Sequence, residues 1–402
     1  MSAARRTAAG RAGRGHRPRV GPLAARPADL TTLDVDALLA DRGTRIIVCC
    51  GSGGVGKTTT SAALALRAAE QGRRVVVLTI DPARRLAQAM GLTELDNTPR
   101  PVTDVGQASG GSLDAMMLDM KRTFDEVVES HASPDKARQI LANPFYQAVS
   151  SSFAGTQEYM AMEKLSQLHN DAWKTGRWDL IVVDTPPSRS ALDFLDAPER
   201  LASFLDGRFI RLLIAPARGP VRLLSAGLGI VTDALTKLLG AQLIKDARTF
   251  VAAFDTLFGG FRQRAEQTYQ LLQAPGTSFV VVAAPQPDAL REAAYFVERL
   301  DQERMPLAGL VLNRVTPHPV AGLDGADAAA GAGRLERSGE HPVTAHLLRL
   351  HADATAAVRR EDQLRRRFSA AHPEVAAAQV PNLPTDVHDL DGLRQVGDLL
   401  TA

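Results

Sequence analysis

The sequence predicts an α/β fold, in which a mostly parallel sheet is covered by helices on both faces and carries an added helical subdomain. Short, continuous apolar runs that suit buried parallel strands alternate with segments of helical periodicity. A glycine-rich loop lies between the first of these runs and the helix that follows it. The 402-residue chain is 45% hydrophobic and 23% charged, as ordinary globular chains are, which excludes wholesale disorder.

The first 30 residues are rich in Ala, Arg, Gly and Pro, and we expect residues 1–30 to form a disordered basic tail. Residues 1–28 contain seven Arg and no Asp or Glu, so the net charge of +2 leaves +2 − 7 = −5 for the rest of the chain. This balance argues against nucleic acid as a partner. A transit peptide or a membrane tether is an alternative interpretation of the tail.

Residues 31–402 are predicted to form one folded domain around the glycine-rich loop. A strand over 45–50, a helix over 58–71 that ends at Gly72, and a strand over 74–80 make a β-α-β unit. Helical patterns separate the later apolar runs, so the same parallel sheet continues. Further buried strands are predicted over residues 178–184, 278–284 and 307–313.

Three other segments have distinct patterns. Residues 190–277 have no strand pattern before the run at 278, and their Leu and Phe recur at helical spacing, which predicts a helical insertion subdomain. Residues 317–343 are rich in Gly, Ala, Asp and Pro and are predicted to be a flexible loop. A helix is predicted from about His346 to Ala371. No run of about 18 uncharged apolar residues occurs, so we expect no transmembrane helix.

The glycine-rich loop, Gly-Ser-Gly-Gly-Val-Gly-Lys-Thr, matches the phosphate-binding pattern G-x-x-x-x-G-K-[ST]. Glycines let the backbone wrap so that its N–H groups face phosphates, and the start of the next helix adds its dipole. Lys57 adds positive charge at the β- and γ-phosphates, and the Thr58 hydroxyl binds Mg²⁺. A purely structural glycine turn is the alternative. The predicted nucleotide-binding residues of this loop are Gly51, Ser52, Gly53, Gly54, Val55, Gly56, Lys57 and Thr58.

Two acidic residues follow predicted strands, at the edge of the sheet where α/β proteins bind ligands. Asp81 ends the strand over 74–80, and a carboxylate there can orient the water that attacks a γ-phosphate. Its alternative role is a helix N-cap before Pro82. Asp184 ends the strand over 178–184 and is predicted to bind Mg²⁺ directly or through water. A turn-capping Asp is the alternative there.

These motifs, in this order, resemble those of the ArsA-type ATPases, which include the arsenite-pump ATPase and the ATPase that delivers tail-anchored membrane proteins. The resemblance spans roughly Thr44 to Leu400. It implies a P-loop NTPase fold and ATP hydrolysis with Mg²⁺. It also implies work as a dimer on a hydrophobic protein client or a membrane protein. The cytoplasm is expected from the two adjacent cysteines, which exclude a disulfide framework and fit a reducing compartment.

Individual motifs carry the resemblance. Residues 51–59 resemble the family's phosphate loop, which adds Thr59 to the nucleotide contacts. Asp81-Pro-Ala resembles switch I, whose Asp activates water, and Asp184-Thr-Pro-Pro resembles switch II. Gly155-Thr-Gln-Glu158 is similar to the element that precedes switch II. Asn313 resembles the asparagine that reads adenine. Val380-Pro381 and Gly392-Leu393 resemble the loop beside the base.

The phosphate loop departs from the family at one position. The family loop begins Gly-Lys-Gly-Gly, and its first lysine reaches the phosphates of the other subunit, whereas this chain has Ser52. We therefore expect either a weakened ATPase or a heterodimer with a related subunit that keeps the lysine. Arg84, Arg85 or Arg189 are alternative sources of the missing charge.

The cysteines also depart from the family. The Cys-x-x-Cys that clamps zinc between subunits in the tail-anchor carriers is absent, so any dimer must close through another interface. Cys49 and Cys50 lie inside a predicted strand, and a soft metalloid site needs several convergent sulfurs. We expect two buried, inert thiols and no arsenite site.

Three functions remain open at this point. The first is an ATP-driven dimeric switch, for which the apolar stripes of residues 190–277 form either a client groove or simply a packed core. The second is a catalytically weak subunit that completes a lysine-bearing paralogue, which Ser52 favours. The third is a positioning ATPase of the ParA or MinD kind that uses the basic tail.

Overall fold

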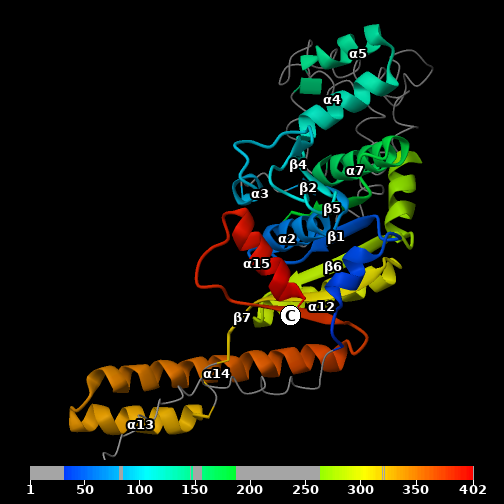
Figure 1. The fold of residues 1–402 in the computed structure, drawn as a ribbon. Coiled ribbons are helices and arrows are strands. Elements are labelled where there is room, and N and C mark those ends of the chain that lie inside the picture. The colour runs from blue at the N-terminus through cyan, green and yellow to red at the C-terminus, as the bar shows by residue number, and fades with distance from the viewer. Residues whose placement is uncertain are drawn as a thin grey trace, which may run out of the picture.

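The computed structural model describes residues 31–80, 85–144, 146–147, 156–186, 263–318, 320 and 322–401. Its centre is an eight-stranded sheet in the order β3-β4-β2-β5-β1-β6-β7-β8 (Figure 1). Every neighbouring pair is parallel except β3 and β4. The strands are β1 (Ile46–Cys50), β2 (Arg74–Thr79), β3 (Arg100–Pro101), β4 (Ser112–Met117), β5 (Leu180–Asp184), β6 (Thr277–Ala283), β7 (Leu307–Val315) and β8 (Ala377–Pro381).

Helices cover both faces of this sheet. On one face lie α1 (Val35–Ala40), α2 (Lys57–Glu70), α3 (Arg85–Ala89) and α15 (Leu390–Leu400), which share one apolar core with the sheet. The other face carries α4 (Met120–His131), α5 (Pro134–Leu141), α7 (Thr156–Thr175), α12 (Pro287–Gln302) and a helix over residues 263–273. Two further helices among the described residues are α13 (Gly325–Ser338) and α14 (Pro342–Ala371).

Strand β1 shows how the sequence builds the two cores. All five of its residues are buried, and their side chains alternate between the faces. Ile46, Val48 and Cys50 enter the core beneath α7 and α12. Ile47 and Cys49 enter the core beneath α2 and α15. A strand buried on both faces needs a continuous apolar run, which is what the sequence has here. The predicted α/β fold is therefore confirmed.

The predicted strands agree closely with the structure. β1, β2, β5, β6 and β7 each lie within two residues of the predicted ends. The helix predicted over 58–71 is α2, and the helix predicted to end at Ala371 is α14. β3, β4 and β8 were not predicted. Pro381, expected in a loop beside the base, is the last residue of β8, and Gly392-Leu393 lie in the first turn of α15.

The flexible loop predicted over 317–343 is wrong for most of its length. Residues 325–338 form α13, whose N-cap Asp324 accepts from Ala326 N at 2.7 Å and whose C-cap Gly339 has a φ of 68°. α13 packs against α14 as a hairpin that extends from the sheet (Figure 1). Gly331 allows this approach, because a Cβ there would lie 3.2 Å from Leu348 Cδ1. The small residues that are typical of a loop in sequence instead let α13 pack closely on α14.

Two predicted segments lie largely outside the described residues. The basic tail, residues 1–30, is one, and residues 190–262 of the predicted helical insertion are the other. The described end of that insertion is helical over 263–273, and β6 begins at Thr277, one residue before the predicted strand. Within the described part of the chain, no helix combines the length and apolarity needed to cross a membrane.

Candidate functional site

The glycine loop connects the end of β1 to the start of α2, as the sequence predicted. Gly54 and Gly56 have φ values of 76° and 94°, which favour glycine. Gly56 is also sterically constrained, because a Cβ there would lie 2.1 Å from Asn313 Nδ2. Gly51 passes so close to β6 that its Cβ would lie 2.1 Å from Val282 O. The bend is therefore fixed by packing on two neighbouring strands.

Lys57 lies inside this loop. Its Nζ donates to Ser52 O at 2.7 Å, and the residue is only 6% exposed. Ser52 is buried as well. The ammonium is thus held within the concave side of the backbone turn, which is where a phosphate-binding lysine must lie.

Asp184 forms the second part of the site. Its Oδ2 accepts from Thr58 Oγ1 at 2.8 Å and from Thr79 Oγ1 at 2.9 Å. Parallel pairing produces this meeting, because the registers of β1–β5 and β2–β5 place Cys49 and Thr79 beside Asp184. The carboxyl ends of the three central strands therefore coincide at the start of α2.

The donors at this point fit a magnesium ion. Thr58 and Asp184 supply a hydroxyl and a carboxylate, which are hard oxygen ligands. Mg²⁺ in nucleotide sites commonly takes only one or two protein oxygens and completes its shell with phosphate oxygens and water. Among the described residues, no group of three or more His, Cys, Asp or Glu could hold a metal ion.

Asn313 lies on β7, beside the loop. Its Nδ2 donates to Val55 O at 2.8 Å, and its Oδ1 accepts from Arg314 N at 3.0 Å. The side chain braces the loop between Val55 and Gly56. The residue is thus adjacent to the phosphate loop, and its predicted contact with adenine stays a prediction.

The roles of Thr79 and Thr185 in the site were not predicted from the sequence. Thr79 Oγ1 donates to Asp184 Oδ2 at 2.9 Å, and Thr185 Oγ1 donates to Cys49 O at 2.9 Å, which ties the segment after β5 to β1. The sequence did offer a signal for Thr79, because it is a polar residue at the end of an otherwise apolar strand, two positions before Asp81. Asp81 itself lies outside the described residues, as does the side chain of Glu158.

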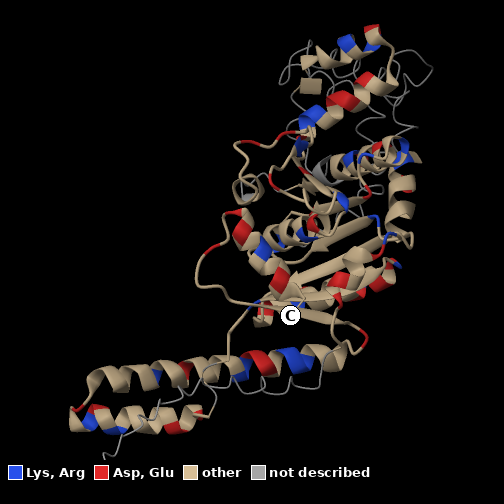
Figure 2. Cartoon of the chain, viewed as in Figure 1, with Lys and Arg blue, Asp and Glu red and all other residues tan. Residues whose placement is uncertain are grey.

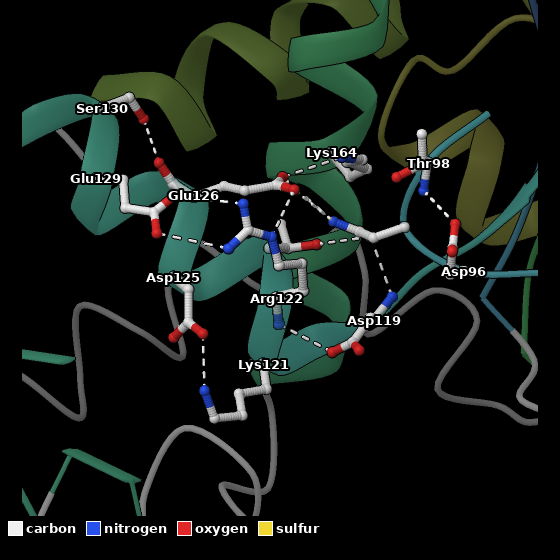
Figure 3. Close-up of polar contacts among 12 residues, drawn as sticks. Asp96, Thr98, Asp119, Lys121, Arg122, Asp125, Glu126, Glu129, Ser130 and Lys164 are labelled. Carbon is white, nitrogen blue, oxygen red and sulfur yellow. Dashed lines mark hydrogen bonds and ion pairs between the residues drawn. The ribbon is translucent and has the colours of Figure 1, made fainter. Parts of the chain in front are cut away.

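A polar cluster connects the chain after α3 to α4 and α7 (Figure 3). Asn97 is buried, donates to both Glu126 oxygens at 3.2 Å, and accepts from Asp119 N and Thr123 Oγ1 at 3.1 Å. Glu126 on α4 also pairs with Lys164 on α7 at 3.0 Å. The segment that follows Asp81 along the chain is thereby anchored to two helices at once.

The two cysteines are buried in β1, as predicted. Burial raises the pKa of Cys50 to about 12 and raises the pKa of Cys49 well above its ordinary value. Both thiols are protonated at neutral pH, and a thiol of this kind is a poor nucleophile and metal ligand.

The comparison with known proteins agrees with this geometry. The family model described as anion-transporting ATPase matches residues 44–323, which include the glycine loop, both strand-end acids and Asn313. The chain belongs to this ATPase family. Its eight-stranded, mostly parallel sheet is accordingly that of a P-loop NTPase, and membership supports ATP binding and a general ATPase activity.

Named relatives match parts of the chain. An arsenical pump-driving ATPase of Acidiphilium multivorum is 33% identical over 158 residues, 39% of this chain and 26% of the relative. ATPase GET3 of Malassezia globosa is 30% identical over 168 residues, 42% of this chain and 46% of the relative. A putative ATPase of Mycobacterium tuberculosis is 26% identical over 375 residues, 89% of this chain and 93% of the relative. The match thus covers about a quarter of the arsenical pump ATPase and about half of GET3.

Proposed function

We propose that this chain is a Mg²⁺-dependent ATP-hydrolysing switch that works as a dimer on a protein or membrane client in the cytoplasm. The observation that carries the proposal is the hydrogen bond of 2.8 Å between Thr58 Oγ1 and Asp184 Oδ2. It joins the end of the phosphate loop to the start of switch II, where a P-loop NTPase holds its metal.

Each residue then has a role in this proposal. The backbone N–H groups of residues 51–59 cradle the phosphates, and Lys57 neutralises charge at the β- and γ-phosphates. Thr58 and Asp184 hold Mg²⁺, which supplies charge stabilisation at the transferred phosphoryl group. Asp81 orients the attacking water. Asn313 and Pro381 flank the adenine.

Closure of the dimer is the proposed switching event. Asp184 is buried and accepts hydrogen bonds from both Thr58 and Thr79. A change of ligand at the γ-phosphate position would therefore alter contacts at the ends of β2 and β5. The segment after Asp81 is bound through Asn97 to α4 and α7, which supports transmission of that change to the helices. The client is proposed to be a hydrophobic protein or a membrane protein, as the resemblance to the ATPases that deliver tail-anchored proteins implies.

A second candidate function rests on Ser52. Where the family places a lysine that acts on the partner's phosphates, this chain has a short neutral side chain whose backbone oxygen already accepts from Lys57. By analogy with an arginine finger, loss of one such cation costs about 10³-fold in rate or more. The chain would then be a weak ATPase that completes a paralogue carrying the lysine.

Steady-state ATP turnover of the purified chain and of Ser52→Lys separates the two candidates. A weak ATPase predicts slow turnover that Ser52→Lys, or addition of a lysine-bearing paralogue, raises by orders of magnitude. Equally fast turnover by both proteins would refute the missing-cation argument while leaving the ATPase proposal intact. Absence of turnover in every combination, with intact ATP binding, would refute hydrolysis.

A further inference from the structure

A basic surface with one exposed tryptophan lies at the edge of the sheet opposite the glycine loop. Arg45 immediately precedes β1, Arg74 opens β2, and Arg177 lies three residues before β5. These strands are parallel neighbours in the order β2-β5-β1, so their amino ends meet at one edge. The glycine loop and Asp184 are at the other edge, beyond the carboxyl ends of β1 and β5.

Trp173 is the centre of this surface. It lies near the end of α7, is 69% exposed, and its ring centroid is 4.7 Å from the guanidinium carbon of Arg45. The exposed Lys174 follows it directly. So large an apolar side chain is uncommon in water, and here the indole ring packs against the guanidinium of Arg45. We call Arg42, Arg45, Arg74, Trp173, Lys174 and Arg177 the basic aromatic patch.

The patch has an excess of positive charge. Arg42 and Arg74 both pair with Asp179, at 2.9 and 3.6 Å, and the same carboxylate also holds the buried Arg73 at 2.8 Å. Arg177 pairs with Asp114, which in addition accepts from Trp178 Nε1. Each of these carboxylates is therefore shared, whereas the side chains of Arg42, Arg74 and Arg177 are all more than half exposed.

The neighbouring acids reduce this charge but do not cancel it, because the patch cations and the buried Arg73 outnumber the carboxylates of Asp41, Asp114, Asp171 and Asp179 by six to four. The carboxylate of Asp41 is turned back onto Gly43 N and the Thr44 hydroxyl. Asp171 is an exposed acid one turn before the end of α7. Burial and the charge of Arg45 lower the pKa of His169, so this imidazole is neutral at pH 7 and neither adds nor removes charge. Figure 2 shows the basic residues at the end of α7 that leads into β5.

We propose that the basic aromatic patch docks on an anionic phospholipid surface, with the Trp173 indole at the level of the headgroups. Tryptophan is enriched at membrane–water interfaces, and exposed Lys and Arg are attracted to anionic headgroups. A single-stranded nucleic acid would instead need several aromatic platforms along a groove. Here the chain has only two tryptophans, and the other, Trp178, is buried.

The position of the patch makes this docking compatible with the nucleotide site. The carboxyl edge of the sheet, with Lys57 and Asp184, faces away from the proposed membrane contact. Membrane docking therefore leaves that edge open to nucleotide and to a second subunit. Docking through Trp173 and its cations does not depend on ATP hydrolysis.

Tryptophan fluorescence of the full chain tests the proposal, because the basic tail of residues 1–28 can bind anionic vesicles but contains no Trp. We expect vesicles of phosphatidylcholine and phosphatidylglycerol to shift the emission to shorter wavelength. We expect brominated lipids in those vesicles to quench it. Vesicles of phosphatidylcholine alone should do neither. Trp173→Phe should abolish both effects, since the remaining Trp178 is buried.

Charge variants test the same surface by vesicle sedimentation. Arg45→Gln and Lys174→Gln should each weaken binding about fivefold, the value of one cation near an anionic surface. Arg291→Gln is the matched control, because Arg291 is an exposed arginine on α12 outside the patch. The proposal is overturned if the chain sediments with anionic vesicles while Trp173 is neither shifted nor quenched. It is also overturned if a single-stranded oligonucleotide, but no vesicle, changes the Trp173 emission.

Discussion

The hydroxyl of Thr58 donates to Asp184 Oδ2 over 2.8 Å, although 126 residues separate the two in the chain. The same oxygen accepts from Thr79, so one carboxylate joins the helix after the glycine loop to two strand ends. Three segments that are distant in sequence therefore share one hydrogen-bonded point. Substitutions around that point test the proposed mechanism.

Asp184→Asn should lower Mg²⁺-dependent ATP turnover by about 100-fold or more, because a neutral amide cannot supply the charge that holds the metal. The amide oxygen can still accept from Thr58 or Thr79, so the fold should survive. Turnover measured across a magnesium titration, with a melting curve for each protein, checks this. Asp288→Asn, at a largely exposed position on α12, is the control. Unchanged turnover in Asp184→Asn would remove Asp184 from the site.

Gly56→Ala should destabilise the chain more than Gly54→Ala and should weaken nucleotide binding. Both glycines have positive φ, for which a side chain costs about 1–2 kcal/mol. Only Gly56 faces a neighbour, because its Cβ would meet Asn313 Nδ2, whereas the Cβ of Gly54 would meet nothing within 4 Å. Urea unfolding of the two variants isolates this steric difference. Equal losses of unfolding free energy would show that Asn313 does not constrain the loop.

Lys164→Met should cost about 1–3 kcal/mol of unfolding free energy, because Glu126, which also accepts from the buried Asn97, loses a buried charged partner. Lys121→Met provides a matched control in the same cluster (Figure 3). The Lys121 side chain is 48% exposed and pairs with Asp125, so its removal should cost less than about 1 kcal/mol. Denaturant unfolding measures both values. A loss in Lys164→Met no greater than in Lys121→Met would contradict the anchoring role of the cluster.

Stability should fall at alkaline pH partly through Cys50. Its pKa rises from 9.0 to about 12 on folding, so the folded chain holds the thiol proton more tightly than the unfolded chain. The resulting stabilisation is complete below the unfolded value and is lost as the pH rises toward the folded value. Between about pH 8 and about pH 10, the unfolding free energy of wild type should decline more steeply than that of Cys50→Ala. Parallel slopes would mean that the thiol is not linked to folding.

The sequence revealed the parts of the fold that depend on local pattern. The apolar runs located β1, β2 and β5, and the glycine spacing located the phosphate loop between β1 and α2. Asp184 was recognised because it ends an apolar strand in a chain that also has the phosphate loop. Its bond to Thr58 then followed from the parallel order of the strands.

The parts of the fold and of the site that the sequence did not predict depend on long-range contacts. β4 contains Asp114, which interrupts the apolar pattern and is buried only because Arg177 and Trp178 satisfy its carboxylate. α13 was taken for a loop because its Gly and Ala are small, and their use in packing on α14 depends on a partner helix. Thr79 was counted simply as part of a strand, since only the register with β5 gives it a hydrogen-bond partner.

Equilibrium binding of ATP to the intact chain in the presence of magnesium tests the central claim most directly. Calorimetry should show that ATP and ADP bind wild type and that AMP binds far more weakly, because the loop holds the β- and γ-phosphates. Lys57→Ala should lose at least about tenfold in affinity, the effect of one charge-assisted contact. If wild type binds neither ATP nor ADP, or if Lys57→Ala binds both as well as wild type does, the glycine loop is not a phosphate site.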